Sequence, residues 1–477
     1  MYSVYLAMLS ATIGQPGPPG AVTPPGPPPW VQAGGAVVPG IPNGLPALQP
    51  AAAQVVQTEQ VPQITIVAPP PPAPPPPAPA PAPAPPDRWA LMRVLQGSWY
   101  GAQLEDSRTT ISGWTEGSYT ASTANISNQP VVWNDRANRF LMNQTWLRIE
   151  RSTVTSGTYE PTWGYRIDAD YGSDYRFSLM RGLLNNQLLN SQGNQNLYGI
   201  DLIQFYGNAY IPTLFQGTDI RAGRLFTPWG YESLEGVSTP FVSRSYAFNW
   251  SPPFTHMGIM VSPTFNAQWS GKFMLANGND VFIGDPSEEM RSVGAITWNS
   301  LDKTDTVTYG WTWGRGKFNA GDRFSPATAG EQSEPAGRNN LNVNDLVWTH
   351  IFNPKLSYAT ELIYGYQTNV PANIPGGIIA LNRTEGTAHW GSTVHYLNYA
   401  FNSRVTGIVR FEMFDDFEGQ RTGFEGLYTA ITAGAQVRPT KATLIRPELR
   451  YDYNGYSTPF EGKHGLFTAA MDFIVRW

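Results

Sequence analysis

The feature that most constrains this chain is an alternation of apolar and polar side chains that recurs along most of its length. The last twelve residues show it clearly, with one apolar face formed by Phe467, Ala469, Met471, Phe473, Val475 and Trp477. The other face is mostly polar, with Ile474 as the exception. Successive side chains of a β-strand point to opposite sides, so this segment predicts an amphipathic strand. A strand of a soluble sheet can show the same pattern. The number of such segments and the lengths of their connections distinguish a soluble sheet from a membrane barrel.

Composition limits the alternatives. No apolar run approaches the roughly 18 residues that a transmembrane helix needs. If the chain spans a membrane, it must do so as a closed barrel, since lipid satisfies no backbone hydrogen bonds. The absence of cysteine excludes disulfides, thiolate metal sites and cysteine nucleophiles. A net charge of −5 argues against a nucleic-acid partner.

Sixteen amphipathic segments can be recognised, each of a length that suits a tilted membrane strand. The sequence therefore predicts an all-β fold, a transmembrane antiparallel up-and-down β-barrel of about 16 strands, with fourteen or eighteen strands as alternatives. The predicted strands are Thr109–Ala121, Arg139–Arg151, Pro161–Tyr171, Gly199–Ile211, Thr218–Phe226, Thr255–Pro263, Asn266–Asn277, Arg291–Ser300, Thr304–Gly314, Leu341–Ile351, Lys355–Gln367, Gly386–Leu397, Ser403–Phe414, Leu427–Arg438, Ala442–Tyr453 and Gly465–Trp477.

The connections between these segments alternate between long and short. Outer-membrane barrels have long outer loops and short periplasmic turns, and aromatic girdles near the strand ends. A soluble β-sandwich has no reason to alternate in this way. The pattern predicts that both termini lie on the periplasmic side.

Charged residues recur on the face opposite the apolar one. A sandwich core would have to desolvate them, whereas a water-filled lumen would not. The densest cluster is Asp168, Asp170 and Asp174 with Arg166 and Arg176. This cluster could create an electrostatic field that biases the passage of ions, or its members could form ion pairs that neutralise one another. The predicted pore-lining residues are Arg166, Asp168, Asp170, Asp174, Arg221, Glu232, Glu235, Arg244, Arg404, Arg410, Glu412, Arg446, Glu448 and Arg450.

The third long connection, Thr227–Phe254, is rich in glycine, proline and aromatic residues. A loop of this length is uncommon unless it packs against the protein or has a function. It could fold over the mouth of the barrel or inward to narrow the lumen. In the second case Glu232, Glu235 and Arg244 would form a charged filter.

The N-terminal region differs from the rest in composition, since 26 of the 43 prolines precede Asp87. Residues 1–14 are interpreted as an export signal or else a disordered leader, although Met1-Tyr2-Ser3 lacks the expected positive charge. Residues 15–86 predict a disordered Pro/Ala-rich linker, either a passive one or a spacer that crosses the periplasm. Residues 87–108 predict a short periplasmic lead-in, with Trp89, Met92 and Leu95 at near-helical spacing.

Several short motifs resemble the OmpL-like β-barrel porins of bacterial outer membranes. They are Ile111-Ser112-Gly113-Trp114, Gly117-Ser118-Tyr119, Asn134-Asp135-Arg136, Asp168 with Tyr171-Gly172-Ser173-Asp174, Arg221-Ala222-Gly223-Arg224, Thr227-Pro228-Trp229-Gly230-Tyr231-Glu232, Ser243-Arg244-Ser245-Tyr246 and Pro253-Phe254-Thr255-His256-Met257-Gly258. The resemblance covers about residues 110–477 and does not include the proline-rich arm. It implies an outer-membrane barrel with passive diffusion, and it assigns no binding residues.

The expected function is a porin: a passive diffusion channel for small hydrophilic solutes or ions, with no cofactor. The alternative is a non-conducting outer-membrane barrel that serves as an envelope anchor or adhesin. Expected partners are outer-membrane lipid, the solutes, and the barrel-assembly machinery acting through the C-terminal strand. By analogy alone, a homo-oligomer such as a trimer would suit sixteen strands.

Enzymatic and metal-binding interpretations are weaker. His256, Ser251 and Asp219 could be drawn as a hydrolase triad, but no nucleophile elbow supports it. His389 and His395 lie six residues apart on one strand face. They predict two lumen or rim histidines rather than a metal site. We therefore expect neither a catalytic site nor a metal site.

Overall fold

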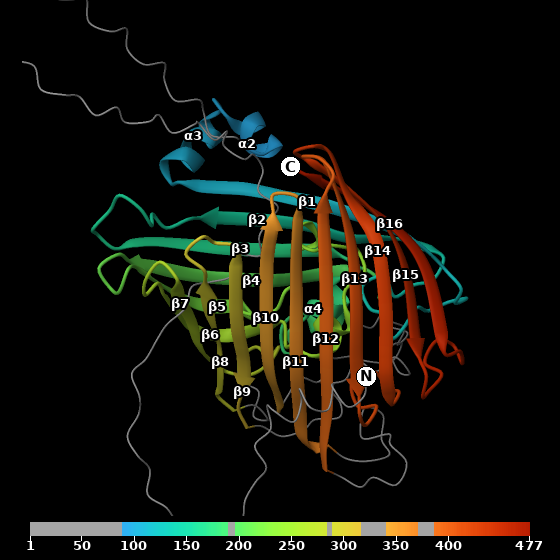
Figure 1. Ribbon diagram of the computed structural model, residues 1–477. Coiled ribbons are helices and arrows are strands. Elements are labelled where there is room, and N and C mark those ends of the chain that lie inside the picture. Colours follow the sequence, from blue (N-terminus) through green and yellow to red (C-terminus); the bar gives the residue numbers. More distant parts are fainter. Residues whose placement is uncertain (1–87, 189–195, 284–288, 316–339, 371–385) are drawn as a thin grey trace, which may run out of the picture. The chain divides into compact units, whose positions relative to one another are not determined.

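The computed structural model describes residues 88–188, 196–283, 289–315, 340–370 and 386–477. Sixteen strands run in chain order around the fold (Figure 1). Their bounds are β1 Thr109–Ser122, β2 Arg139–Arg151, β3 Thr162–Gly172, β4 Gly199–Ile211, β5 Thr218–Phe226, β6 Thr255–Pro263, β7 Trp269–Ala276, β8 Arg291–Asn299, β9 Asp305–Trp313, β10 Leu341–Asn353, β11 Leu356–Val370, β12 Gly386–Ala400, β13 Val405–Asp416, β14 Gly426–Thr440, β15 Thr443–Asn454 and β16 Gly465–Arg476.

The strands close into a single antiparallel barrel in which each strand pairs with its sequence neighbours. The last strand pairs with the first along a register that runs from Trp114↔Arg476 to Ser122↔Thr468. Closure leaves no strand edge exposed to lipid. The predicted strand number and up-and-down topology are thus confirmed.

The connections alternate as the sequence predicts. One end of the barrel, called here the short-turn end, carries the seven short connections together with the start of β1 and the end of β16. The opposite, long-loop end carries the other eight connections, most of which are longer; the exception to the alternation is 152–161 at the short-turn end, which is about as long as 417–425 and 455–464. Strand length also varies around the barrel: β5 to β9 have 8 or 9 residues each, whereas β10 to β16 have 12 to 15.

The polar faces of the strands point into the barrel. On β15 the side chains of Arg446, Glu448 and Arg450 are buried. Leu449 and Tyr451, which alternate with them, are 54% and 47% exposed. An apolar outer face and a charged inner face match the arrangement of a transmembrane barrel, in which the outer face contacts lipid.

Two short helices precede the barrel, α2 (Ala90–Leu95) and α3 (Trp99–Asp106). The Met92 sulfur accepts a hydrogen bond from the backbone N–H of Ile111 at 3.4 Å, which ties α2 to β1. The ring of Trp89 lies against the guanidinium of Arg476, 5.4 Å from the ring centre. No helix in the described part of the chain is both long enough and apolar enough to cross a membrane.

Two sequence expectations need correction. Arg404 lies in the turn before β13, because that strand begins only at Val405. Of the two positions expected for His389 and His395, lumen or rim, the lumen is wrong. The two histidines alternate with the inward-facing Trp390, Val394 and Tyr396, so they lie on the outer face. Each histidine is hydrogen bonded to a tyrosine of β11, Tyr364 for His389 and Tyr358 for His395.

Candidate solute pathway through the lumen

The long connection Thr227–Phe254 lies inside the barrel. Its ends are held together where β5 and β6 begin to separate, by a hydrogen bond from the N–H of Thr227 to the carbonyl of Phe254 at 2.9 Å. Between them it forms a 3₁₀ turn, η2 (Gly236–Ser238), and a short helix, α5 (Tyr246–Trp250). We call this segment the inner loop.

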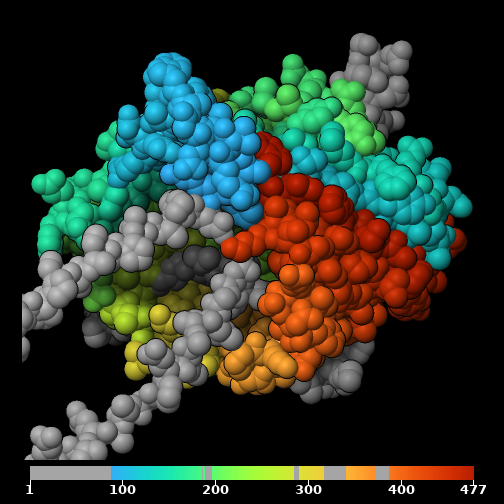
Figure 2. All heavy atoms as spheres, turned by 90° about the horizontal axis from the view of Figure 1, so that it is seen from above, coloured from blue at the N-terminus to red at the C-terminus, as the bar shows by residue number. Residues whose placement is uncertain are grey.

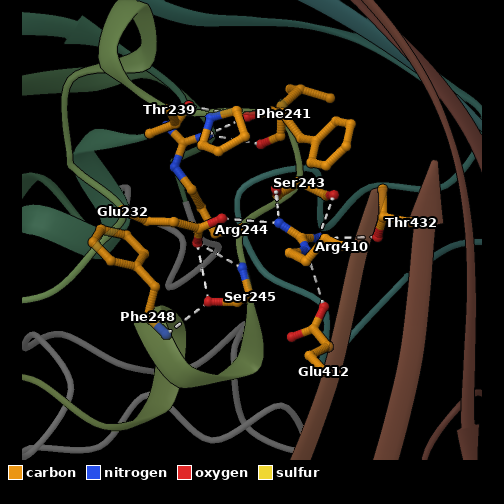
Figure 3. A network of polar contacts seen from close by, with 12 residues as sticks. Glu232, Thr239, Phe241, Ser243, Arg244, Ser245, Phe248, Arg410, Glu412 and Thr432 are labelled. Carbon is orange, nitrogen blue, oxygen red and sulfur yellow. Dashed lines mark hydrogen bonds and ion pairs between the residues drawn. The ribbon is translucent and has the colours of Figure 1, made fainter. Parts of the chain in front are cut away.

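Arg410 of β13 is the centre of the contacts that hold the inner loop (Figure 3). Its guanidinium donates to Glu232 Oε1 and to the carbonyl of Ser243, both at 2.9 Å. It also pairs with Glu412 of the same strand at 3.2 Å. Glu412 in turn accepts a hydrogen bond from the backbone N–H of Tyr246. Both acidic partners and the arginine are buried, so the loop is attached by desolvated, charge-assisted hydrogen bonds.

Two arginines of β15 continue this attachment. Arg446 donates to the carbonyls of Gly236 and Thr239 at 2.8 and 2.7 Å. Arg450 donates to the carbonyl of Arg244 at 2.9 Å. These bonds use the wall's charges to satisfy loop carbonyls that would otherwise be buried without partners.

The inner loop also crosses to other parts of the wall. Trp229 donates its indole N–H to the carbonyl of Trp311 on β9 at 3.1 Å. The N–H of Tyr231 donates to Glu361 on β11. At the opposite side, Gln144 of β2 bonds the loop at the carbonyl of Leu234 and the N–H of Gly236. The loop therefore spans the lumen between separate strands and narrows it.

Aromatic side chains pack the inner loop toward the long-loop end. The ring of Trp133, from the connection after β1, packs in tilted contacts against the rings of Phe177, Phe248 and Phe254, with ring centroids no more than 6.0 Å apart. Its indole N–H donates to Asn249 at 2.6 Å. Burial of these rings fixes the loop by apolar packing as well as by charge.

Glu235 of the inner loop contacts the part of the barrel wall that the loop does not cover. It pairs with Arg166 at 2.8 Å and with Arg148. Both arginines also pair with Asp168 at 2.8 Å. Burial alone raises the pKa of Glu235, but the two arginine charges outweigh it and hold that pKa below its ordinary value.

Thirteen of the fourteen predicted pore-lining residues lie in the lumen and divide into two groups by exposure, whereas Arg404 lies in the exposed turn before β13. The buried ones are Asp168, Asp170, Asp174, Glu232, Arg244, Arg410, Glu412, Arg446, Glu448 and Arg450. The inner loop or its neighbours cover most of them, which leaves little side chain for a solute to touch. Arg166, Arg221 and Glu235 keep 16–34% of their side chains exposed.

Within the buried group, Glu232 and Arg244 fix the loop's own conformation. Glu232 accepts hydrogen bonds from the N–H and hydroxyl of Ser245, and Arg244 donates to the carbonyls of Phe241 and Val242 (Figure 3). Asp174 follows β3 and accepts hydrogen bonds from Asn143 and Gln144. Burial raises its pKa to about 7.

Sequence reasoning missed several inner-face cations, among them Arg148, Lys272, Arg438 and Arg476. The alternation of side chains along the strands could have predicted two of them, Arg476 and Arg438. Arg476 follows Asp472 and Ile474 on the inner face of β16, and Arg438 follows the buried Gln436 on β14. Lys272 was harder to recognise, because its inner-face neighbour Met274 is apolar.

Seen from the short-turn end, the molecule is hollowed inside the barrel beside the green and yellow strands (Figure 2). These strands include β4 to β8. Partly exposed Arg221 and Lys272 lie on their inner faces, and nearby Tyr206, Met260 and Met274 form a small buried cluster. The lumen is therefore bounded by the inner loop on one side and by this part of the wall on the other.

Comparison with known families and structures agrees with this architecture. A family model described as "Putative beta-barrel porin-2, OmpL-like" matches residues 108–476. A search of curated proteins gave no match.

Among solved structures, similar chains include the anion-selective porin from Comamonas acidovorans. It has 10% identity and a TM-score of 0.51, over 77% of this chain and 99% of that one. The outer-membrane channel DcaP of Acinetobacter baumannii has 8% identity and a TM-score of 0.48, over 77% and 97%. OprB of Pseudomonas putida has 11% identity and a TM-score of 0.48, over 80% and 96%. At such identities the likeness to the first of these concerns the fold alone.

Proposed function

Since the chain belongs to the OmpL-like β-barrel porin family, over residues 108–476, we propose that it is a passive diffusion channel for small hydrophilic solutes. The family and the closed barrel place it in the bacterial outer membrane. Solutes cross down their gradient, without a cofactor and without a covalent step.

One observation carries this proposal. The inner loop is fixed to the wall by buried ion pairs, while the inner faces of β3 to β7 keep partly exposed charged side chains. A barrel that served only as an anchor would have no need for water-accessible charge inside. A water-filled lumen narrowed by an inward loop is the form expected of a diffusion pore.

The experiment that tests the proposal is conductance of the purified full chain in planar bilayers. We expect discrete, long-lived conductance steps. Swelling of liposomes in sugars of graded size then gives the pore width. Barrels that are folded by heat-modifiable gel mobility but give no conductance steps would exclude the channel and favour the anchor or adhesin.

The C-terminal strand is proposed to be the part recognised by the barrel-assembly machinery, and a homo-oligomer is proposed by analogy. Gel filtration and crosslinking in detergent test the second point. Of the fourteen sequence-predicted residues, we propose that Arg166, Arg221 and Glu235 are the ones that contact solutes, since these three keep exposed side chain in the lumen.

A further inference from the structure

Six cations line the lumen in a continuous curved row. They are Arg438 of β14, Arg476 of β16, Arg148 of β2, Arg166 of β3, Arg221 of β5 and Lys272 of β7. Each lies in the half of its strand nearest the short-turn end. We call this row the cationic arc.

Neighbouring members of the arc lie close enough for their charges to interact. Arg438 interacts with Arg476, and Arg476 with Arg148. Arg148 and Arg166 share Glu235. Tyr206 interacts with both Arg166 and Arg221, and Arg221 with Lys272. The arc therefore follows the wall across the seam where β16 meets β1.

Four acids lie along the arc, Glu150, Asp168, Asp219 and Glu235, and they do not balance its six cations. Asp168 and Glu235 neutralise Arg148 and Arg166, and Asp219 pairs with Arg221 at 2.5 Å. Lys272, Arg438 and Arg476 form no ion pair with any carboxylate in the described part of the chain. Arg438 donates to the amide oxygen of Gln436, and Arg476 to the carbonyl of Val237 at 3.4 Å.

The surplus charge of the arc is positive, whereas the net charge of the whole chain is −5. Many charges elsewhere in the lumen are buried and form ion pairs, as in the Arg410–Glu232 and Arg446–Asp472 contacts. The field that a passing solute meets is therefore set mainly by the unpaired cations.

We propose that the cationic arc makes the channel prefer small anions, inorganic or carboxylate, over cations of the same size. This rests on the proposed channel function. A solute anion loses part of its hydration in the narrowed lumen. Attraction to the charges of Lys272, Arg438 and Arg476 offsets the energetic cost of that loss.

The test is the reversal potential of the purified full chain in planar bilayers under a tenfold potassium chloride gradient at low ionic strength. The wild type should give a potential of the sign that indicates chloride preference. The variants Lys272→Gln, Arg438→Gln and Arg476→Gln should each lower the chloride-to-potassium permeability ratio by about fivefold, because loss of the charge raises the energy of chloride in the lumen and lowers that of potassium. A unit charge ~8 Å from an ion in water changes its energy by slightly less than RT.

Two further variants sharpen the test. Lys355→Gln removes a cation from the turn 354–355, outside the lumen, and should leave the ratio unchanged. Asp168→Asn frees Arg148 and Arg166 from their shared carboxylate and should raise chloride preference. Raising the salt to about 1 M should weaken every effect, because the Debye length falls to about 3 Å.

The outcomes are distinct. Conductance steps with potassium preference, or a ratio unchanged in the triple variant of Lys272, Arg438 and Arg476, would overturn the anion preference and leave the channel intact. Folded barrels without any conductance would instead refute the channel function itself.

Discussion

At the scale of single residues, Arg410 is the side chain on which the inner loop most depends. It reaches Glu232 and the carbonyl of Ser243 in the loop, and Glu412 on its own strand (Figure 3). All these groups are buried. A charge removed from such a network leaves its partners desolvated and unpaired, which costs more than the loss of an exposed ion pair.

We therefore expect Arg410→Ala to loosen the inner loop by about 3 kcal/mol. The barrel should still fold, since its strand pairing does not involve this side chain. Single-channel recordings should then show more open-channel noise and a larger mean conductance. Arg404→Ala, an exposed arginine in the turn before β13, is the matched control, and equal noise in the two variants would contradict the role given to Arg410.

The residue scale also shows where sequence reasoning reached its limit. Alternation alone placed Arg410, Glu412 and Arg446 on the inner face, and they lie there. It could not say that the inner loop covers them, because coverage depends on contacts between segments about 170 to 210 positions apart. It also could not tell that His395 is satisfied by Tyr358 on the outer face.

At the scale of elements, the seam between β16 and β1 is closed by contacts at both of its ends. At the short-turn end, Gly113 and Trp477 exchange two backbone hydrogen bonds of 3.0 and 2.9 Å. The Trp477 ring lies over Gly113, where an added Cβ would come within 2.6 Å of it. The indole thus fills space that only a glycine at position 113 leaves open.

We expect Trp477→Ala to reduce the yield of folded barrel, since the ring's apolar contact is worth about 2 kcal/mol. Ion selectivity of the barrels that do form should be unchanged, because the ring is not part of the cationic arc. Heat-modifiable gel mobility measures the first effect and reversal potential the second. Tyr456→Ala, an exposed aromatic residue of the connection 455–464, is the control. A shifted reversal potential in Trp477→Ala would contradict this separation of roles.

At the long-loop end, Glu461 holds the same seam. Its carboxylate accepts backbone hydrogen bonds from Asn125, Ile126 and Ser127 at 2.8 to 3.0 Å. Those bonds hold its pKa below the ordinary value. The folded-state pKa lies below the unfolded one, so the stabilisation is present at neutral pH. It is lost as pH falls through the folded-state pKa.

Hydrogen exchange tests this directly. Protection of the Asn125, Ile126 and Ser127 amides, corrected for intrinsic rates, should fall as the solution is acidified. Glu461→Gln should lower it already at neutral pH. Glu289→Gln changes an exposed loop carboxylate elsewhere and should have no effect. Amide protection that stays constant down to pH 3 would show that the Glu461 carboxylate does not hold the seam between β16 and β1.

The sixteen strands were predictable because a two-residue period with one lipid-facing side leaves a strong signal in each segment. β7 was among the least well bounded, with Asn266–Asn277 expected and Trp269–Ala276 found. Asn266 instead caps the preceding turn through hydrogen bonds to the N–H groups of Gln268 and Trp269. Helices α4 (Tyr175–Ser178) and α5, which form within long loops, carried no comparable periodic signal.

At the scale of the whole molecule, the barrel and the proline-rich region can be separated experimentally. Barrel closure uses strands that run from Thr109 to Arg476. We expect deletion of residues 15–86 to leave conductance and selectivity unchanged. If that region is a spacer, the deletion should reduce co-sedimentation with cell wall. Unchanged fractionation would remove the spacer hypothesis, and altered conductance would contradict the independence of the barrel.

The uneven strand lengths have a consequence for the surrounding membrane. Strands β5 to β9, with 8 or 9 residues, are close to the shortest that cross a hydrocarbon core, whereas β10 to β16 have several residues to spare. Lipids beside the short strands must compress to match them, at a cost of fractions of a kcal/mol per Å. The bilayer around this barrel is then thinner on one side, and short-chain lipids should accumulate there.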